Sequence, residues 1–119
     1  MIKKKMKIEY INSFGPPEYV VLKDNNIGIV VSEKETKGVE LSADKIDLFW
    51  QTMNEIDVWN WRRKYSPEEE MLDGHIWELN LASNTGRSKK VWGQHTYPEN
   101  FNDLIKALNN LFETKIDRY

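Results

Sequence analysis

The stretch from Phe101 to Phe112 carries an apolar stripe along one face of a helix, and this stripe most constrains the fold. Pro98 stands just before it, where a proline suits the first helical turn. Such a helix is stable only when its stripe is buried, so the chain has to supply a second layer. The stripe follows helical spacing without a polar interruption: Phe101, Leu104, Ile105, Leu108, Leu111 and Phe112.

A second helix is expected after Ser42, a residue type suited to capping a helix N-terminus. Asp44 then falls in the first turn, where negative charge suits the helix dipole. The helix should end near Asp57, because the residues that follow change to a period of two. Its buried stripe is predicted to comprise Ile46, Phe49, Trp50, Met53 and Ile56.

In the other segments apolar and polar residues alternate with a period of two, which is typical of strands exposed to solvent on one face. In one of them Trp77 shares a face with Leu79 and Leu81, and we expect this tryptophan to be buried. Asp-Asn-Asn at 24–26 and Asn-Thr-Gly at 84–86 supply turn chemistry between strand pairs. The expected strands are 4–11, 18–23, 27–32, 76–83 and 87–94, with a short additional strand at 39–41.

The element order is therefore β-β-β(-β)-α-β-β-α. Short connections favour antiparallel pairing of neighbouring strands. We expect an α+β fold, a single antiparallel sheet of five to six strands with two helices packed on one face. Residues 1–119 should form one domain, long enough to bury roughly two-thirds of the unfolded-chain surface.

Composition limits the classes of function. Apolar residues are 39% and charged residues 30%, which is typical of a soluble globular domain. The absence of cysteine excludes disulfides and thiol chemistry. The basic opening "MIKKKMK" is not followed by an apolar run, and no stretch approaches the ~20 apolar residues of a membrane span. We therefore expect a cytoplasmic location and no membrane partner.

Three motifs carry a family resemblance: "VWNWRRKY", "DGHIWELNL" and "GQHTYPENF". Together they resemble a bacterial family of small domains of unknown function. In that family a Trp-rich segment ending in Tyr precedes Asp-Gly-x-x-Trp, and Gly-x-Asn-x-Tyr-Pro-x-x-Phe leads into a final helix. The resemblance covers about residues 42 to 115, with His95 standing where the family has Asn. It implies a fold and boundaries rather than an activity.

His75 and His95 are the candidate metal ligands. Each lies beside one strand of the expected 76–94 hairpin, so both should sit at its open end. Asp73 or Glu78 would add a carboxylate to complete a three-ligand zinc site, and a small metal-dependent or ligand-binding enzyme is the alternative function. Against it, both histidines adjoin turns, where histidine is ordinarily solvated, and no known short catalytic or metal motif is present. We expect no catalytic residues and no cofactor.

The segment "VWNWRRKY" indicates a binding surface. In an extended chain Trp59 and Trp61 would share a side, and we expect Trp59 to be mainly structural, closing the first helix against the sheet. Nucleic-acid binding would use the same cations together with Arg87, Lys89 and Lys90, but the net charge of -2 and the acidic run Glu68–Glu70 argue against it. Tryptophan, tyrosine and arginine anchor protein interfaces. The expected surface comprises Trp61, Arg62, Arg63, Tyr65 and Trp92.

The sequence thus predicts a non-enzymatic bacterial protein-interaction domain with a protein partner. Some small bacterial proteins of this kind are immunity proteins or antitoxins, and this association suggests a similar binder here. The sequence indicates neither the identity of the partner nor an oligomeric state.

Overall fold

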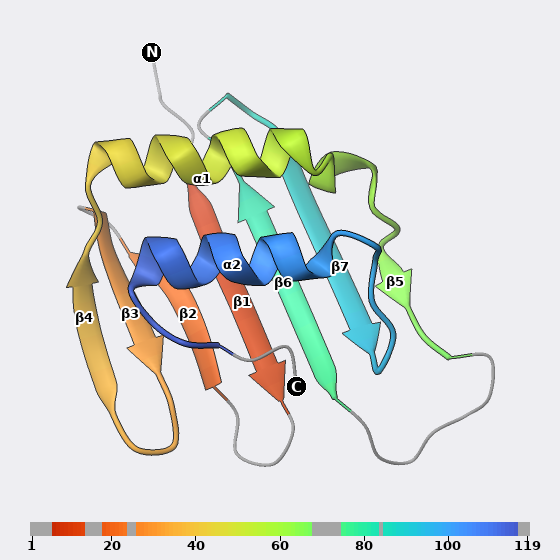
Figure 1. Ribbon diagram of the computed structural model, residues 1–119, viewed down its shortest axis with the longest axis horizontal. Coiled ribbons are helices and arrows are strands. Elements are labelled where there is room, and N and C mark those ends of the chain that lie inside the picture. Colours follow the sequence, from red (N-terminus) through yellow and green to blue (C-terminus); the bar gives the residue numbers. More distant parts are fainter. Residues whose placement is uncertain (1–5, 14–17, 24–25, 68–74, 84, 117–119) are drawn as a thin grey trace.

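The computed structural model describes residues 6–13, 18–23, 26–67, 75–83 and 85–116. Within these residues seven strands form one sheet in the order β4-β3-β2-β1-β6-β7-β5, and two helices lie on one of its faces (Figure 1). In chain order the elements are β1 (Lys7–Ser13), β2 (Glu18–Lys23), β3 (Ile27–Val31), β4 (Thr36–Glu40), α1 (Ala43–Glu55), the 3₁₀ helix η2 (Val58–Asn60), β5 (Lys64–Tyr65), β6 (Ile76–Ala82), β7 (Ser88–Gln94) and α2 (Phe101–Phe112).

The α+β class, the single sheet and the two helices on it confirm the sequence prediction, but the purely antiparallel sheet of five to six strands is wrong. The first four strands form an antiparallel meander, and β1 pairs with β6 of the antiparallel β6–β7 hairpin. β5 pairs with β7 in parallel, which makes the sheet mixed. The physical reason is that β5 reaches the sheet edge through α1 and η2 rather than through a hairpin turn.

The helices pack against each other and run in opposite directions across the sheet (Figure 1). Ser42 caps α1 as expected, because its Oγ accepts a hydrogen bond from the Lys45 backbone N–H at 3.2 Å. The buried side of the sheet and the helical stripes form one core that includes Ile8, Tyr10, Val30, Phe49, Met53, Trp77, Leu79, Leu104, Leu108 and Phe112. No helix in the described ranges is long and apolar enough to cross a membrane.

The tryptophans divide between this core and its rim. Trp77 is fully buried, which confirms the prediction. Trp50 was also expected to be buried, but it is only half-buried, because it flanks the α1 stripe near the strand ends. Trp92 is half-buried.

The expected extended segment 58–65 is also corrected. Asp57 adopts a left-handed conformation with φ of 54°, and η2 follows it. Only Lys64 and Tyr65 are strand. This turn buries Trp61, which is 8% exposed, and leaves Trp59 half-buried at the surface.

Gly93 allows β7 to receive the Trp77 ring. The two residues are paired across β6 and β7, and a Cβ at Gly93 would lie 2.1 Å from Trp77 Nε1. The indole therefore lies directly over the glycine backbone, stacked on Tyr65 of β5 at 6.1 Å between ring centroids. This packing fixes β5 against β7.

Candidate functional site

Two basic and aromatic segments that are far apart in the sequence meet at the β5–β7 edge of the sheet. Lys64 pairs with Trp92 and Tyr65 with Gly93. The Trp92 N–H donates to the Arg63 carbonyl at 2.9 Å, which extends the contact by one residue. We call the resulting surface the cationic edge, and define it as Trp59, Arg62, Arg63, Lys64, Arg87, Lys89, Lys90 and Trp92.

Three of its cations lie over aromatic rings. Lys64 Nζ is 5.3 Å from the Trp92 ring centroid, and Arg87 Cζ is 5.5 Å from that of Trp59. Arg62 Cζ lies 5.7 Å from the ring of Tyr65. Such contacts are each worth about 0.5–1 kcal/mol at exposed sites, enough to bias the orientation of a long side chain. The edge therefore presents partly ordered cations rather than freely moving ones.

A groove of about 740 Å³ adjoins the cationic edge and extends over β6 to Lys7 of β1. Its lining includes Trp59 and Arg63, with Lys89, Lys90 and Trp92 on β7 and Glu78 on β6 as its acidic member among the described residues. A cavity of this size lies within the usual range for binding sites.

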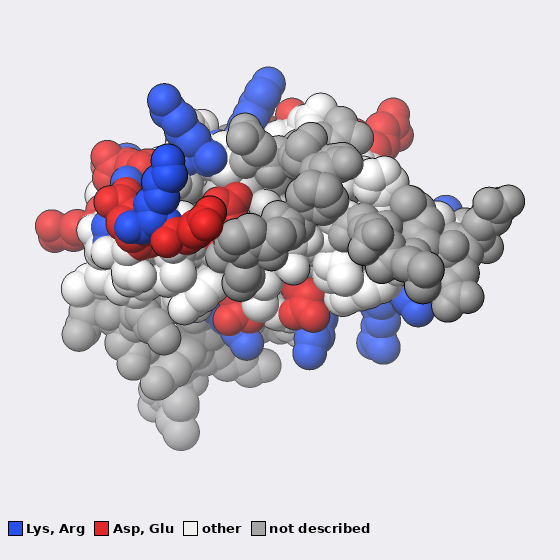
Figure 2. Space-filling view, turned by 90° about the horizontal axis from the view of Figure 1, so that it is seen from below, with Lys and Arg blue, Asp and Glu red and all other residues white. Residues whose placement is uncertain are grey.

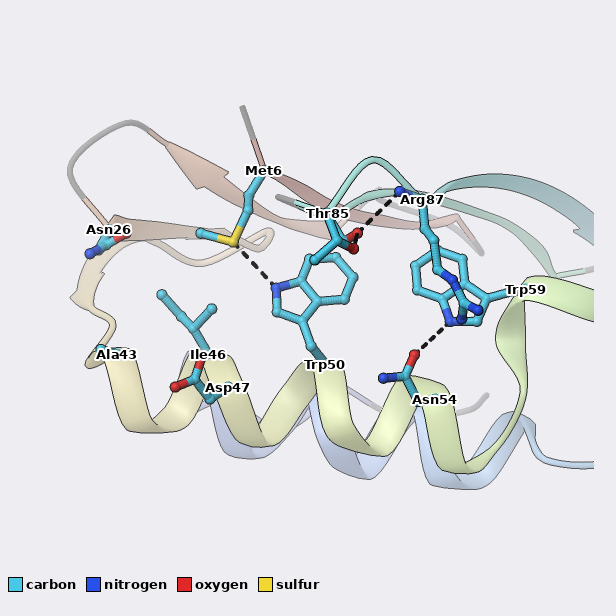
Figure 3. A pocket seen from close by; sticks show the side chains of 11 residues that line it. Met6, Asn26, Ala43, Ile46, Asp47, Trp50, Asn54, Trp59, Thr85 and Arg87 are labelled. Atoms are coloured by element: carbon cyan, nitrogen blue, oxygen red, sulfur yellow. Dashed lines mark hydrogen bonds between the residues drawn. The ribbon is translucent and has the colours of Figure 1, made fainter. Parts of the chain in front are cut away.

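A second groove of about 830 Å³ adjoins the first, since Trp59 lines both. It runs between α1 and the strand ends, and Figure 3 shows Trp50 and Trp59 side by side on its wall with Arg87 close to Trp59. The two indoles stack at 6.1 Å with 16° between their planes. Trp59 Nε1 donates to Asn54 Oδ1 at 2.8 Å, and Trp50 Nε1 donates to Met6 Sδ at 3.3 Å. The hydrogen bonds hold both rings in place.

The residues expected at the binding surface differ in how far they are exposed. Arg62 and Arg63 are exposed and belong to the cationic edge, whereas Tyr65 and Trp92 are half-buried within it or beside it. Trp61 lies in the core, so it offers little surface to a partner. The reasoning from sequence placed Trp59 in a structural role and left Arg87 out of the protein-binding surface. The basic run "RSKKVW" was the signal for the contribution of β7.

His75 lies at the other end of β6, fully buried among polar partners. Its Nδ1 is 2.6 Å from the Tyr97 hydroxyl, and its Nε2 contacts Asn12 Oδ1. Asn12 Nδ2 in turn donates to Glu18 Oε1 at 3.0 Å, which fixes the orientation of the amide. His75 therefore carries its proton on Nε2 and accepts from Tyr97 at Nδ1.

Burial lowers the pKa of His75, and the neighbouring His95 lowers it further, so the neutral form is favoured. Burial also raises the pKa of Tyr10, whose hydroxyl lies 3.4 Å from Asn12 Oδ1. Sequence reasoning missed Asn12 and Glu18. The available signal was Asn12 itself, a polar residue at the next inward position after Ile8 and Tyr10.

The structure brings the two histidines together, since the His95 N–H donates to the His75 carbonyl at 2.7 Å. The expectation that His75 is solvated is wrong, because Tyr97 and Asn12 satisfy its ring within the core. A metal ion at His75 would have to displace one of these partners. Asp73 lies outside the described residues, and within those residues no three metal-ligating side chains gather. No observation favours the metal-dependent enzyme.

In comparison with known proteins, no family model, no curated protein and no solved structure matches the chain. The resemblance to the bacterial family of small domains therefore stays a hypothesis.

Proposed function

We propose that the chain is a non-enzymatic protein-interaction domain that binds a partner protein through the cationic edge. The observation that carries the proposal is the meeting of segments 59–65 and 87–92 on one sheet edge, with a groove that both segments help to line. Tryptophan and arginine are the residue types that most often anchor protein interfaces. Here Trp59, Trp92 and Arg63 line a concave surface. Lys64 and Arg87 lie over the two indole rings, and these cation–π contacts restrict the motion of the rings before a partner arrives.

The distribution of charge favours a protein over a nucleic acid. In Figure 2 the charged side chains at the lower right, the side on which β7 and β5 lie in Figure 1, are basic. Elsewhere in that view acidic and basic side chains are interspersed. Nucleic-acid binding depends on neutralising many phosphates over a broad surface, and the net charge of the chain is -2. A cationic area confined to one edge better suits an acidic patch on a protein.

A cytoplasmic, toxin-neutralising binder of the immunity or antitoxin kind is the specific form that the family resemblance suggests. Such a binder needs a rigid recognition surface and no catalytic groups. The stacked and hydrogen-bonded tryptophans of the two grooves support rigidity. The partner would then carry the activity, and this chain would inhibit it by occupying an acidic region.

Affinity capture with matched variants tests the proposal. The tagged wild-type chain, the double variant Arg63→Glu/Lys90→Glu and the control Lys106→Glu would be used to capture proteins from a lysate of the source bacterium. Lys106 is an exposed cation on α2, so its reversal changes charge away from the edge. We expect one stoichiometric protein with the wild type and the control, and its loss with the double variant. Equal recovery with all three proteins, or recovery of chaperones alone, would contradict the proposal.

A further inference from the structure

The hydrogen-bonding pattern of β7 shows which of its backbone groups face outward. Ser83 N donates to the Arg87 carbonyl at 2.8 Å, and His95 N donates to the His75 carbonyl at 2.7 Å. In an antiparallel ladder, bonded and non-bonded pairs alternate. The odd-numbered residues between these two therefore bond to β6. Trp92 confirms the alternation, because its N–H points the other way, to the Arg63 carbonyl.

Ser88 and Lys90 consequently direct their N–H and C=O groups away from β6. β5 pairs only with Trp92 and Gly93, and no other strand in the described part of the chain pairs with β7 on this side. The four residues from Ser88 to Val91 thus have no paired strand in the described part of the chain over about 13 Å, at roughly 3.3 Å per residue, and η2 packs beside β7. An open edge of this kind is a template for an added strand.

The side chains around the open edge are cationic on both faces of the sheet. Lys89 lies on the face of its partner Leu81, which is buried beneath the helices, and Lys90 lies on the opposite face. Lys64, beside Trp92, is also on that opposite face. A strand laid along β7 would alternate its own side chains between these faces. Acidic side chains on either face would therefore meet cations across the new pairing.

The edge at β4 gives an internal comparison. It too is the last strand of the sheet, but it carries Lys37 and Glu40, charges of opposite sign. Mixed charge does not select an acidic segment, and it is a common means of protecting an edge from unwanted pairing. The β7 strand itself carries charge of one sign, with aromatic neighbours and a groove in which Glu78 of β6 is the acidic side chain among the described residues.

We infer that the partner contributes an extended acidic segment, which adds to the sheet as a strand along Ser88–Val91 within the 740 Å³ groove. This inference rests on the proposed function and specifies the chemistry of the partner. Main-chain hydrogen bonds to Ser88 and Lys90 give the segment its register, and the lysines and arginines select its charge. Trp59 and Trp92 supply apolar contacts at the sides of the groove.

Amide hydrogen exchange measured by NMR tests the strand geometry. The probe is an acetylated and amidated peptide of three valine–glutamate repeats, added at millimolar concentration to the isotopically labelled full chain. We expect exchange of the Ser88 and Lys90 amides to slow by about tenfold or more, with little change at Lys89 and Val91, which already bond to β6. Contact through side chains alone would not produce this alternation.

Three control ligands sharpen the result. The same peptide with alternate N-methyl groups cannot form the ladder, and a valine–lysine peptide reverses its charge; neither should bind. The third ligand is oligo-deoxythymidine. An absence of any effect from the acidic peptide, equal binding of its N-methylated form, or tighter binding of the oligonucleotide would overturn the inference.

Two variants at Lys90 distinguish the contribution of its backbone N–H from that of its side-chain charge. Lys90→Ala removes the charge, whereas Lys90→Pro also removes the outward N–H without removing a bond to β6, and proline is tolerated at such edge positions. We expect Lys90→Pro to weaken peptide binding well beyond the effect of Lys90→Ala. If Lys90→Pro does not fold, as judged by circular dichroism, the N-methylated peptide decides the question.

The proposed function and this inference can fail separately. If Arg63→Glu/Lys90→Glu loses the captured partner while Lys90→Pro binds it as well as Lys90→Ala does, strand addition is wrong and the cationic edge remains the binding surface. If the double charge reversal has no effect on capture, the proposed function itself is wrong.

Discussion

Replacing Gly93 by alanine tests the packing that holds β5, and with it the cationic edge, against β7. The new Cβ would lie 2.1 Å from Trp77 Nε1 and 2.2 Å from its Cε2. Non-bonded carbon atoms pack at about 3.5–4.0 Å, so the indole would have to move by more than ~1 Å. Trp77 is fully buried, with Phe101 at 4.7 Å and Tyr97 at 6.3 Å between ring centroids, so any movement of the indole displaces neighbouring rings.

Two terms set the expected loss of stability. Overpacking a core costs about 1–3 kcal/mol. Moving the ring also breaks the hydrogen bond from Trp77 Nε1 to the Thr96 carbonyl, 3.1 Å long, and an unsatisfied buried donor costs about 1–3 kcal/mol. The free energy of unfolding should therefore fall by about 2–6 kcal/mol, a large part of the total for a domain of this size.

Urea unfolding followed by tryptophan fluorescence measures this loss. Gly38→Ala is the matched control, because a Cβ there would find its nearest neighbours at 3.9 Å on Ile27 and 4.0 Å on Ile29. The control should change stability by no more than about 0.5 kcal/mol. In a Trp77→Phe background the cost of Gly93→Ala should shrink, because the smaller ring relieves the clash. Equal, small effects of the two alanine substitutions would refute the reasoning.

Two further predictions concern the hydrogen bonds made by His75 and by Asn109. Because the pKa of His75 is lowered on folding, the unfolded state binds this proton more readily. The free energy of unfolding should therefore fall as the pH drops below about 6.5, by at most ~1.4 kcal/mol per pH unit. Urea titrations across this range should show a shallower slope for His75→Gln, and an unchanged slope would contradict the assignment. Asn109 accepts from Ile116 N at 2.6 Å and donates to Ile116 O at 3.0 Å. Asn109→Ala should thus cost about 1–3 kcal/mol in thermal unfolding, against little for exposed Asn110→Ala, and similar losses for both would count against this anchoring role.

The layer of helices and the layer of strands were predictable from sequence, because an apolar stripe can be buried in only a few arrangements of helices and sheets. The stripes of α1 and α2 and the alternation around Trp77 each require one covered face. Trp50 shows where the pattern loses precision. It lies at helical spacing from Ile46 and Met53, but periodicity does not say where the covering sheet ends, so it cannot separate a core position from a rim position.

The segment from Val58 to Tyr65 was not predictable by period-two counting. A single left-handed residue, Asp57, redirects the chain into η2, which buries Trp61 and leaves Trp59 half-buried against α1. The parallel pairing of β5 depends on a long-range contact with β7, which follows it in the chain, and no local signal encodes such a contact. Sequence identified most of the cations of the cationic edge, but only the topology places them together.

The most direct test of the central claim is the affinity of the captured partner for edge variants. Isothermal titration would compare the wild type, Arg63→Glu/Lys90→Glu and Lys106→Glu, after circular dichroism has shown that each is folded. We predict that the dissociation constant rises by at least about tenfold, or ~1.4 kcal/mol, for the edge variant and stays unchanged for the α2 variant. An unchanged affinity for the edge variant, or an equal loss for both variants, would contradict the claim that the cationic edge is the binding surface.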